Sequence, residues 1–167
     1  MGQGCRVAKL QSCKVTRLGD YMRDENEAGQ SERSVTRYGE WLEQVPEHIK
    51  KDRLWELEVY RKGLFFFDLV WWDCGMLTRY ELGKPIAQQL IRSAGSICAN
   101  MGEGFGRGFG KDYARFLTYA LGSARESRGW YYRGRNLLKP DVLDHRLELL
   151  ATIIAGLVTL SQQQTKR

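Results

Sequence analysis

Apolar side chains recur every three to four positions from about residue 52 to residue 162, and this spacing constrains the fold more than any other feature of the sequence. Such a repeat places one apolar stripe along an α-helix. Proline, which interrupts helices, occurs only at Pro46, Pro85 and Pro140. No stretch alternates polar and apolar residues as a half-buried strand would. The sequence therefore predicts an all-α protein without a sheet.

Proline and glycine divide this region into four helices joined by short connections. Pro85 and Pro140 suit the first turn of a helix, and Asp52 is of a residue type that caps helix N-termini. Glycines at every second position from 102 to 110 favour a tight connection, because glycine propagates a helix poorly. Long helices with short connections pack antiparallel. We expect an antiparallel up-down four-helix bundle over residues 51–164, with helices near 52–76, 85–102, 111–138 and 140–162.

The region before the bundle has a different composition. Residues 1–37 contain few large apolar side chains and no sustained periodicity, which is typical of a flexible leader. Met22 is an alternative start, because residues 1–21 add nothing that a fold requires. Residues 38–50 are expected to form a short helix, stopped by Pro46, and a linker.

The first long helix is apolar on nearly every side. Its segment Phe65–Trp72 contains one polar residue, Asp68. A helix that is apolar all round must be buried all round, whereas a bundle buries one stripe of each helix. The surplus apolar surface therefore predicts a second contact. Either another subunit covers it or the short helix does, because Trp41, Leu42 and Val45 share one face of that helix.

The formal net charge is +6, and one segment accounts for all of it. Residues 107–139 hold eight Lys/Arg and two Asp/Glu, an excess that attracts polyanions. Within it, four arginines between Arg125 and Arg135 surround the aromatic run Trp130–Tyr132. Cations suit phosphates and rings suit exposed bases, so the pattern indicates nucleic-acid binding. The alternative is that the rings belong to the core and the arginines form a solvated or acid-paired helix face.

Two rows of polar residues have helical spacing on the second and third helices. If antiparallel packing brings the rows together, they form a hydrogen-bonded polar seam that fixes the register of the bundle. The functional alternative is an acid/base site made by Glu103 and Glu126, although no nucleophile or histidine accompanies them. The rows consist of Arg92, Ser96, Asn100 and Glu103 on the second helix and Arg115, Tyr119, Ser123 and Glu126 on the third.

The residues of common catalytic and metal sites do not converge in the sequence. His48 and His145 lie far apart, and a metal site needs several convergent ligands. The glycine run matches neither G-x-G-x-x-G nor a Walker A loop. We therefore expect no enzymatic activity, no cofactor and no metal, with a metal-dependent nuclease as the enzymatic alternative. Four cysteines without a C-x-x-C pair indicate reduced thiols and a cytoplasmic protein, and the apolar run Gly63–Leu77 is too short to span a membrane.

Three sequence elements carry a resemblance to a known family. They are Leu54–Arg61, the pattern Ser96-x-x-x-Asn100-x-x-Glu103-Gly104, and Arg115-Phe116-Leu117 followed by Ala120-Leu121-Gly122-Ser123-Ala124-Arg125-Glu126. Together they resemble the bacterial four-helix bundle proteins, which include proteins encoded in intervening sequences of large-subunit ribosomal RNA genes. The accessory variability determinant of diversity-generating retroelements is a relative. The resemblance covers about residues 50–160 and leaves the leader outside.

The resemblance implies a bundle that assembles into a homo-oligomeric ring, commonly a pentamer, and its members are suspected of binding RNA or DNA. We therefore expect a non-enzymatic nucleic-acid-binding oligomer. The alternative is an interaction scaffold that recruits a protein such as a reverse transcriptase without direct nucleic-acid contact. Arg115 and Arg125 belong to the family's structural motif and are expected to serve the bundle. The predicted phosphate contacts are Arg107, Lys111, Arg128, Arg133 and Arg135.

Overall fold

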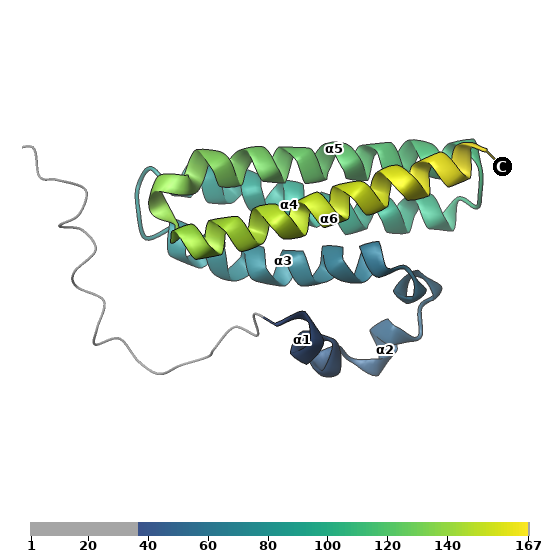
Figure 1. Ribbon diagram of the computed structural model, residues 1–167, viewed down its shortest axis with the longest axis horizontal. Helices are drawn as coiled ribbons and strands as arrows, with labels where there is room; N and C mark the ends of the chain where they lie inside the picture. The colour runs from purple at the N-terminus through teal and green to yellow at the C-terminus, as the bar shows by residue number, and fades with distance from the viewer. Residues whose placement is uncertain (1–36, 167) are drawn as a thin grey trace, which may run out of the picture. The chain divides into compact units, whose positions relative to one another are not determined.

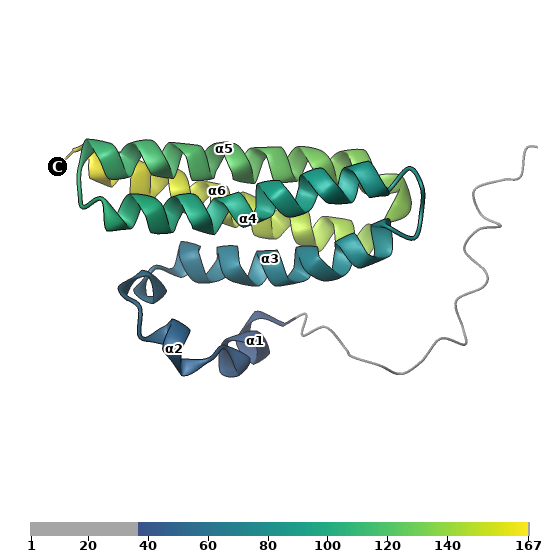
Figure 2. The same cartoon turned by 180° about the vertical axis from the view of Figure 1, so that it is seen from behind.

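The computed structural model describes residues 37–166, and it contains no strand in that range. The four long helices run alternately up and down, and the last returns beside the first (Figures 1 and 2). The prediction of an all-helical protein is confirmed. The predicted leader lies outside the described residues except for Arg37. The long helices are α3 (Glu58–Leu77), α4 (Lys84–Gly106), α5 (Lys111–Gly134) and α6 (Pro140–Thr165).

Short helical segments precede the bundle and cover part of its first helix. They are α1 (Tyr38–Gln44), α2 (Glu47–Lys50) and the 3-10 turn η2 (Arg53–Glu56). The buried Trp41 ring of α1 lies 5.5 Å from the Phe65 ring of α3, and its indole N–H donates to the Asp68 carboxylate at 2.6 Å. The expectation that the short helix packs on the bundle is confirmed.

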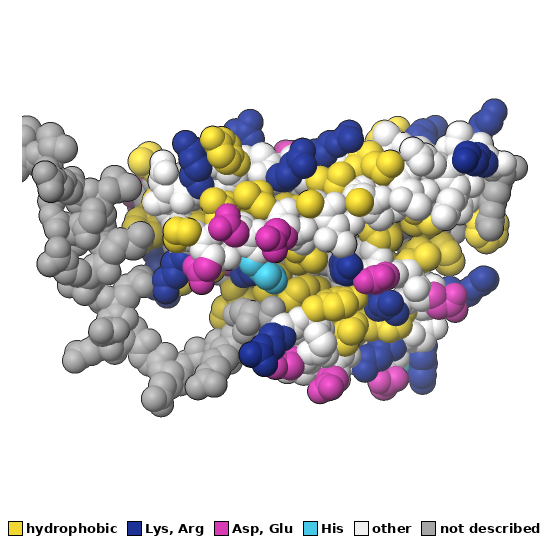
Figure 3. All heavy atoms as spheres, viewed as in Figure 1, with side chains coloured by type: hydrophobic (Ala, Val, Ile, Leu, Met, Phe, Trp, Pro, Cys, Tyr) yellow, Lys and Arg dark blue, Asp and Glu magenta, His cyan; other side chains and the backbone are white. Residues whose placement is uncertain are grey.

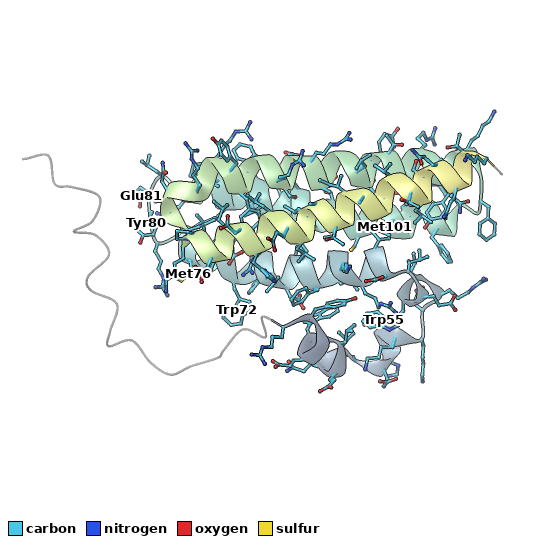
Figure 4. All side chains as sticks on the ribbon, in the orientation of Figure 1. Trp55, Trp72, Met76, Tyr80, Glu81 and Met101 are labelled. Atoms are coloured by element: carbon cyan, nitrogen blue, oxygen red, sulfur yellow. The ribbon has the colours of Figure 1, made fainter. Side chains whose placement is uncertain are left out.

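This cover reaches Leu69 but leaves Trp71 and Trp72, further along α3, exposed. Trp71 keeps 64% and Trp72 keeps 42% of its surface exposed. Figure 4 shows Trp72 projecting from α3 on the side that faces away from the other three long helices. Within the described part of the chain, the surplus apolar surface predicted for this helix is thus covered as far as Leu69 and open at Trp71 and Trp72.

The core lies between the four long helices, and α4 and α5 form its most extensive contact. Gly104 permits this approach, because a Cβ at that position would lie 2.5 Å from the Cβ of Phe116. Burying each of the large core side chains stabilises the fold by about 1.5–3 kcal/mol before entropy is counted. The largest fully buried side chains include Phe66, Leu77, Leu90, Ile97, Met101, Leu117, Tyr131, Leu150 and Ile153.

Several helix boundaries differ from those expected; α5, for example, ends at Gly134 rather than near residue 138. Leu57 has extended backbone and separates η2 from α3, so Asp52, whose carboxylate accepts from the Leu54 N–H at 2.8 Å, caps the 3-10 turn rather than the long helix. The helix α4 continues through the first glycines to Gly106. The turn itself uses Gly108 and Gly110, which have φ of 101° and 82°, a region that glycine enters without steric cost.

Candidate nucleic-acid interface

The C-terminal half of α5 and the 3-10 turn η3 (Arg135–Leu137) that follows it carry a cluster of exposed cations around an exposed aromatic ring, called here the α5 basic surface. None of its four arginines forms an ion pair with any residue described between 37 and 166. In the space-filling view, basic side chains follow the edge occupied by α5, and acidic ones lie over α6 beside it (Figure 3). The surface consists of Arg125, Arg128, Tyr132, Arg133 and Arg135, all exposed.

Aromatic rings hold two of these guanidinium groups in place. The Arg135 guanidinium lies over the Tyr132 ring, 4.4 Å from its centroid, and also donates to the Tyr132 carbonyl at 2.9 Å. Arg133 lies 4.8 Å from the centroid of the Trp130 ring. Such contacts contribute about 0.5–1 kcal/mol at exposed sites and leave the N–H groups at the guanidinium edge available. The surface is therefore partly pre-organised for phosphate oxygens.

The structure divides the five predicted phosphate contacts into two groups. Arg128 joins Arg133 and Arg135 on the α5 basic surface. Lys111 begins α5, about 33 Å along the helix from Arg133. Arg107 ends α4 at the same end as Lys111; it pairs with Glu103 at 2.6 Å and covers the Phe116 ring.

Arg125 lies on the α5 basic surface, although it is not one of the five predicted phosphate contacts. We expected it to serve the bundle, yet it is exposed and lines a groove together with Arg128. The helical spacing of Arg125, Arg128 and Tyr132 was the signal that could have identified it.

The predicted polar seam is not a bonded network between the helices. Ser96 Oγ donates to the Arg92 carbonyl at 2.9 Å and Asn100 Nδ2 to the Ser96 carbonyl at 2.7 Å, both within α4. Ser123 Oγ likewise donates to the Tyr119 carbonyl of its own helix at 3.1 Å. The charged members Arg92, Glu103, Arg115 and Glu126 are exposed. These hydrogen bonds of the outer polar rows thus stay within each helix, and the idea that the rows fix the register of the bundle stays a prediction.

The acid/base alternative for the same rows is not supported by the geometry. Glu103 pairs with Arg107, while Glu126 accepts from the Trp130 indole N–H at 3.3 Å. The antiparallel register, in which Ser93 meets Ser127, places the two carboxylates about 13 Å apart along the bundle. They therefore do not face one another as a catalytic pair.

The structural polar contact between helices lies elsewhere, in the core. Arg146 of α6 donates to both carboxylate oxygens of Asp73, from Nε at 2.8 Å and from Nη2 at 3.2 Å. The Tyr131 hydroxyl of α5 donates to the same carboxylate at 2.6 Å. Burial raises the pKa of Tyr131 well above its usual value, and the adjacent Asp73 charge raises it further. This buried polar cluster ties α3, α5 and α6 together.

Sequence reasoning missed the buried polar cluster, although a signal was present. Asp73 lies within an otherwise apolar run, and a carboxylate buried there needs a partner. Arg146 has the core-facing spacing of Leu150 and Ile153 on α6, and that spacing marked it as the partner.

The remaining metal-ligating and nucleophilic side chains of residues 37–166 lie apart from one another or are partly buried. Between residues 37 and 166 no three His, Cys, Asp or Glu side chains converge as metal ligands would. Burial raises the pKa of Cys74 to about 11 and that of Cys98 to about 12, so neither thiol ionises near neutral pH. His48 and His145 are both exposed. In this part of the chain, no helix combines the length and hydropathy that crossing a membrane requires.

Comparisons with known proteins place the fold. A crystal structure of a protein of unknown function from the S23 ribosomal protein family of Bacteroides thetaiotaomicron VPI-5482 aligns with a TM-score of 0.59 and 21% identity. The alignment covers 62% of this chain and 98% of that one, and at this identity it supports the fold alone. No curated protein matches significantly. The model of the 23S rRNA-intervening sequence proteins matches residues 56–157, more than half of the sequence and the whole of α3, α4 and α5. The chain therefore belongs to the 23S rRNA-intervening sequence protein family.

Proposed function

We propose that the protein is a non-enzymatic homo-oligomer that binds RNA or DNA through the α5 basic surface. The observation that carries the proposal is the convergence of four exposed arginines and the exposed Tyr132 on the C-terminal half of α5 and the turn η3 that follows it. Arginines that have no acidic partner are free to bind phosphate oxygens, which dominate the affinity of proteins for nucleic acid.

The charges on α6 limit where a polyanion can lie. Asp144 and Glu148 are exposed, and the acidic side chains of α6 lie beside the basic edge of α5 (Figure 3). They repel phosphates, so the nucleic-acid backbone is expected to follow α5 rather than the α5–α6 boundary.

Self-association is supported by the uncovered apolar side of α3. Trp71 and Trp72 are the kind of exposed side chains that protein interfaces bury. The family resemblance implies a ring of copies, commonly five. A Trp71→Ser/Trp72→Ser variant is expected to reduce the mass of the native species in sedimentation experiments. A wild-type protein that sediments as a single subunit would contradict this part of the proposal.

Nucleic-acid binding is tested by comparing the two ends of α5. Fluorescence anisotropy with labelled RNA and DNA oligonucleotides is measured over a range of salt concentrations. Arg128→Gln/Arg133→Gln/Arg135→Gln is expected to weaken binding, and the slope of log K against log salt should fall by about one for each phosphate-binding side chain that the variant removes. The matched control Arg107→Gln/Lys111→Gln removes cations at the other end and should change binding much less.

Two results would count against nucleic-acid binding at this surface. Absence of binding at low salt would remove the nucleic-acid function. A larger loss of affinity in the control variant would move the binding surface to the α4–α5 connection. In the alternative scaffold function, a protein partner held by apolar contacts at Trp71 and Trp72 would bind with little salt dependence.

A further inference from the structure

A groove on the α5 basic surface has the composition of a site for one nucleotide. It runs between α5 and α6, has a volume of about 390 Å³, and is lined by Arg125, Arg128, Gly129, Tyr132 and Leu147. Tyr132 is 59% exposed, so one flat aromatic wall is open to a ligand. A Cβ at Gly129 would lie 2.8 Å from Arg133 Nη1, so the missing side chain lets that guanidinium lie across the helix surface.

The groove has two chemically different sides. Its α5 side carries the guanidinium groups of Arg125 and Arg128. Its α6 side presents Leu147, with the exposed carboxylates of Asp144 and Glu148 close to it in the same helix. An anionic group is attracted to the first side and repelled from the second. A ligand that fits both sides has a phosphate at one end and a flat, uncharged ring at the other.

We infer that this groove holds one unpaired base of a single-stranded RNA or DNA, with the adjoining phosphate on Arg125 and Arg128. The base stacks on Tyr132 and contacts Leu147. Arg135 lies over one face of the Tyr132 ring, so the base is expected on the opposite face. The inference rests on the proposed nucleic-acid binding and adds that single strands are preferred. Bases inside a duplex are already stacked and paired and cannot enter the groove.

Three probes separate the base from the phosphates. They are a short single-stranded oligonucleotide, the same strand with abasic sites, and the corresponding duplex. All three carry phosphates, and only the first offers unpaired bases. Anisotropy titrations at one salt concentration are expected to give the tightest binding for the intact single strand.

Two tyrosines of α5 provide a matched pair of variants. Tyr132→Leu removes the stacking ring of the groove, and Tyr119→Leu removes a ring that is 51% exposed and belongs to an outer polar row of α5. Stacking on an aromatic side chain contributes about 1–3 kcal/mol per base, so Tyr132→Leu should weaken binding of the intact single strand about fivefold or more. It should leave the abasic strand unchanged, and Tyr119→Leu should leave all three probes unchanged.

The outcomes distinguish this inference from the proposed function. Equal, salt-dependent binding of all three probes would overturn the inference and leave nucleic-acid binding intact. So would a Tyr132→Leu effect that is the same for the intact and abasic strands, or a matching effect in Tyr119→Leu. Absence of binding to every probe would remove both.

Discussion

The buried polar cluster and the outer polar rows are both built from polar and charged side chains of the long helices, but only the cluster joins helices to one another. In the cluster, Asp73 accepts from Arg146 and Tyr131, which come from two other helices. In the rows, Ser96 and Asn100 donate to carbonyls of their own helix. The difference is burial. A polar group that water cannot reach must find a partner, whereas an exposed one gains little from any partner it finds.

The largest effect is expected from removing the basic member of the cluster. Arg146→Met leaves the Asp73 carboxylate buried without its charged partner and should destabilise the protein by about 3–5 kcal/mol. Urea unfolding followed by circular dichroism measures the change. Arg92→Met, in an outer polar row, is the matched control and should stay within about 0.5 kcal/mol.

Removing both charges distinguishes two costs. One is the cost of leaving Asp73 buried without a partner, and the other is the net contribution of the ion pair to stability. Asp73→Leu/Arg146→Met should recover much of the stability that Arg146→Met loses, because no unpaired charge remains. A cost below about 1 kcal/mol for Arg146→Met alone would show that water reaches Asp73, and the contrast between the two polar groups would then fail.

Smaller changes in stability are expected from two glycines of α4, one substitution destabilising the protein and the other stabilising it. A Cβ at Gly104 would lie 2.5 Å from Phe116 Cβ and 2.9 Å from Tyr113 Cδ2, so Gly104→Ala forces helices apart and should cost about 1–3 kcal/mol. At Gly102 the nearest atom is Leu54 Cδ1 at 3.8 Å, an ordinary contact. Gly102→Ala should therefore stabilise the protein by about 0.5–1 kcal/mol, since alanine favours the helix.

These two glycines show which features of the fold could be predicted from the sequence and which could not. The spacing of apolar residues predicted four helices and their order. The sequence also placed the end of α4 at the start of the glycine run, near residue 102, because glycine has a low propensity for helix. The helix continues to Gly106 because packing against Phe116 requires the absence of a side chain at Gly104, and a contact between helices is invisible in local propensity.

The same limit explains the errors at the candidate site. Spacing placed the outer polar rows on one side of each helix, but it could not tell the core side from the solvent side when small and polar residues mix on both. The positive charge of α5 was evident in the sequence. The separation of Lys111 and Arg107 from Arg133 along the helix, and the exposure of Arg125, required the geometry.

A neutral hydrogen bond in the core should matter less than the charged cluster. The buried Ser127 hydroxyl donates to Ser93 Oγ at 2.9 Å, between α5 and α4. Ser127→Ala should cost about 1 kcal/mol, since a typical buried hydrogen bond contributes about that much. Ser123→Ala, one turn away in an outer polar row, removes a bond within its own helix and should change the unfolding free energy hardly at all. Equal costs at the two serines would remove the distinction between inner and outer positions.

The smallest expected effect lies at the edge of the buried polar cluster, where His145 Nδ1 is 2.7 Å from Arg146 Nη1. The guanidinium can only donate, so this nitrogen accepts and the imidazole is neutral. Burial and then the Arg146 charge lower the pKa of His145. As the pH falls below about 6.5, the unfolded chain takes up the proton before the folded one does, and stability decreases. Urea midpoints at pH 7 and near pH 5.5 should differ in the wild type, and His145→Asn should reduce that difference. An unchanged difference in the variant would show that a group other than His145 causes the pH dependence.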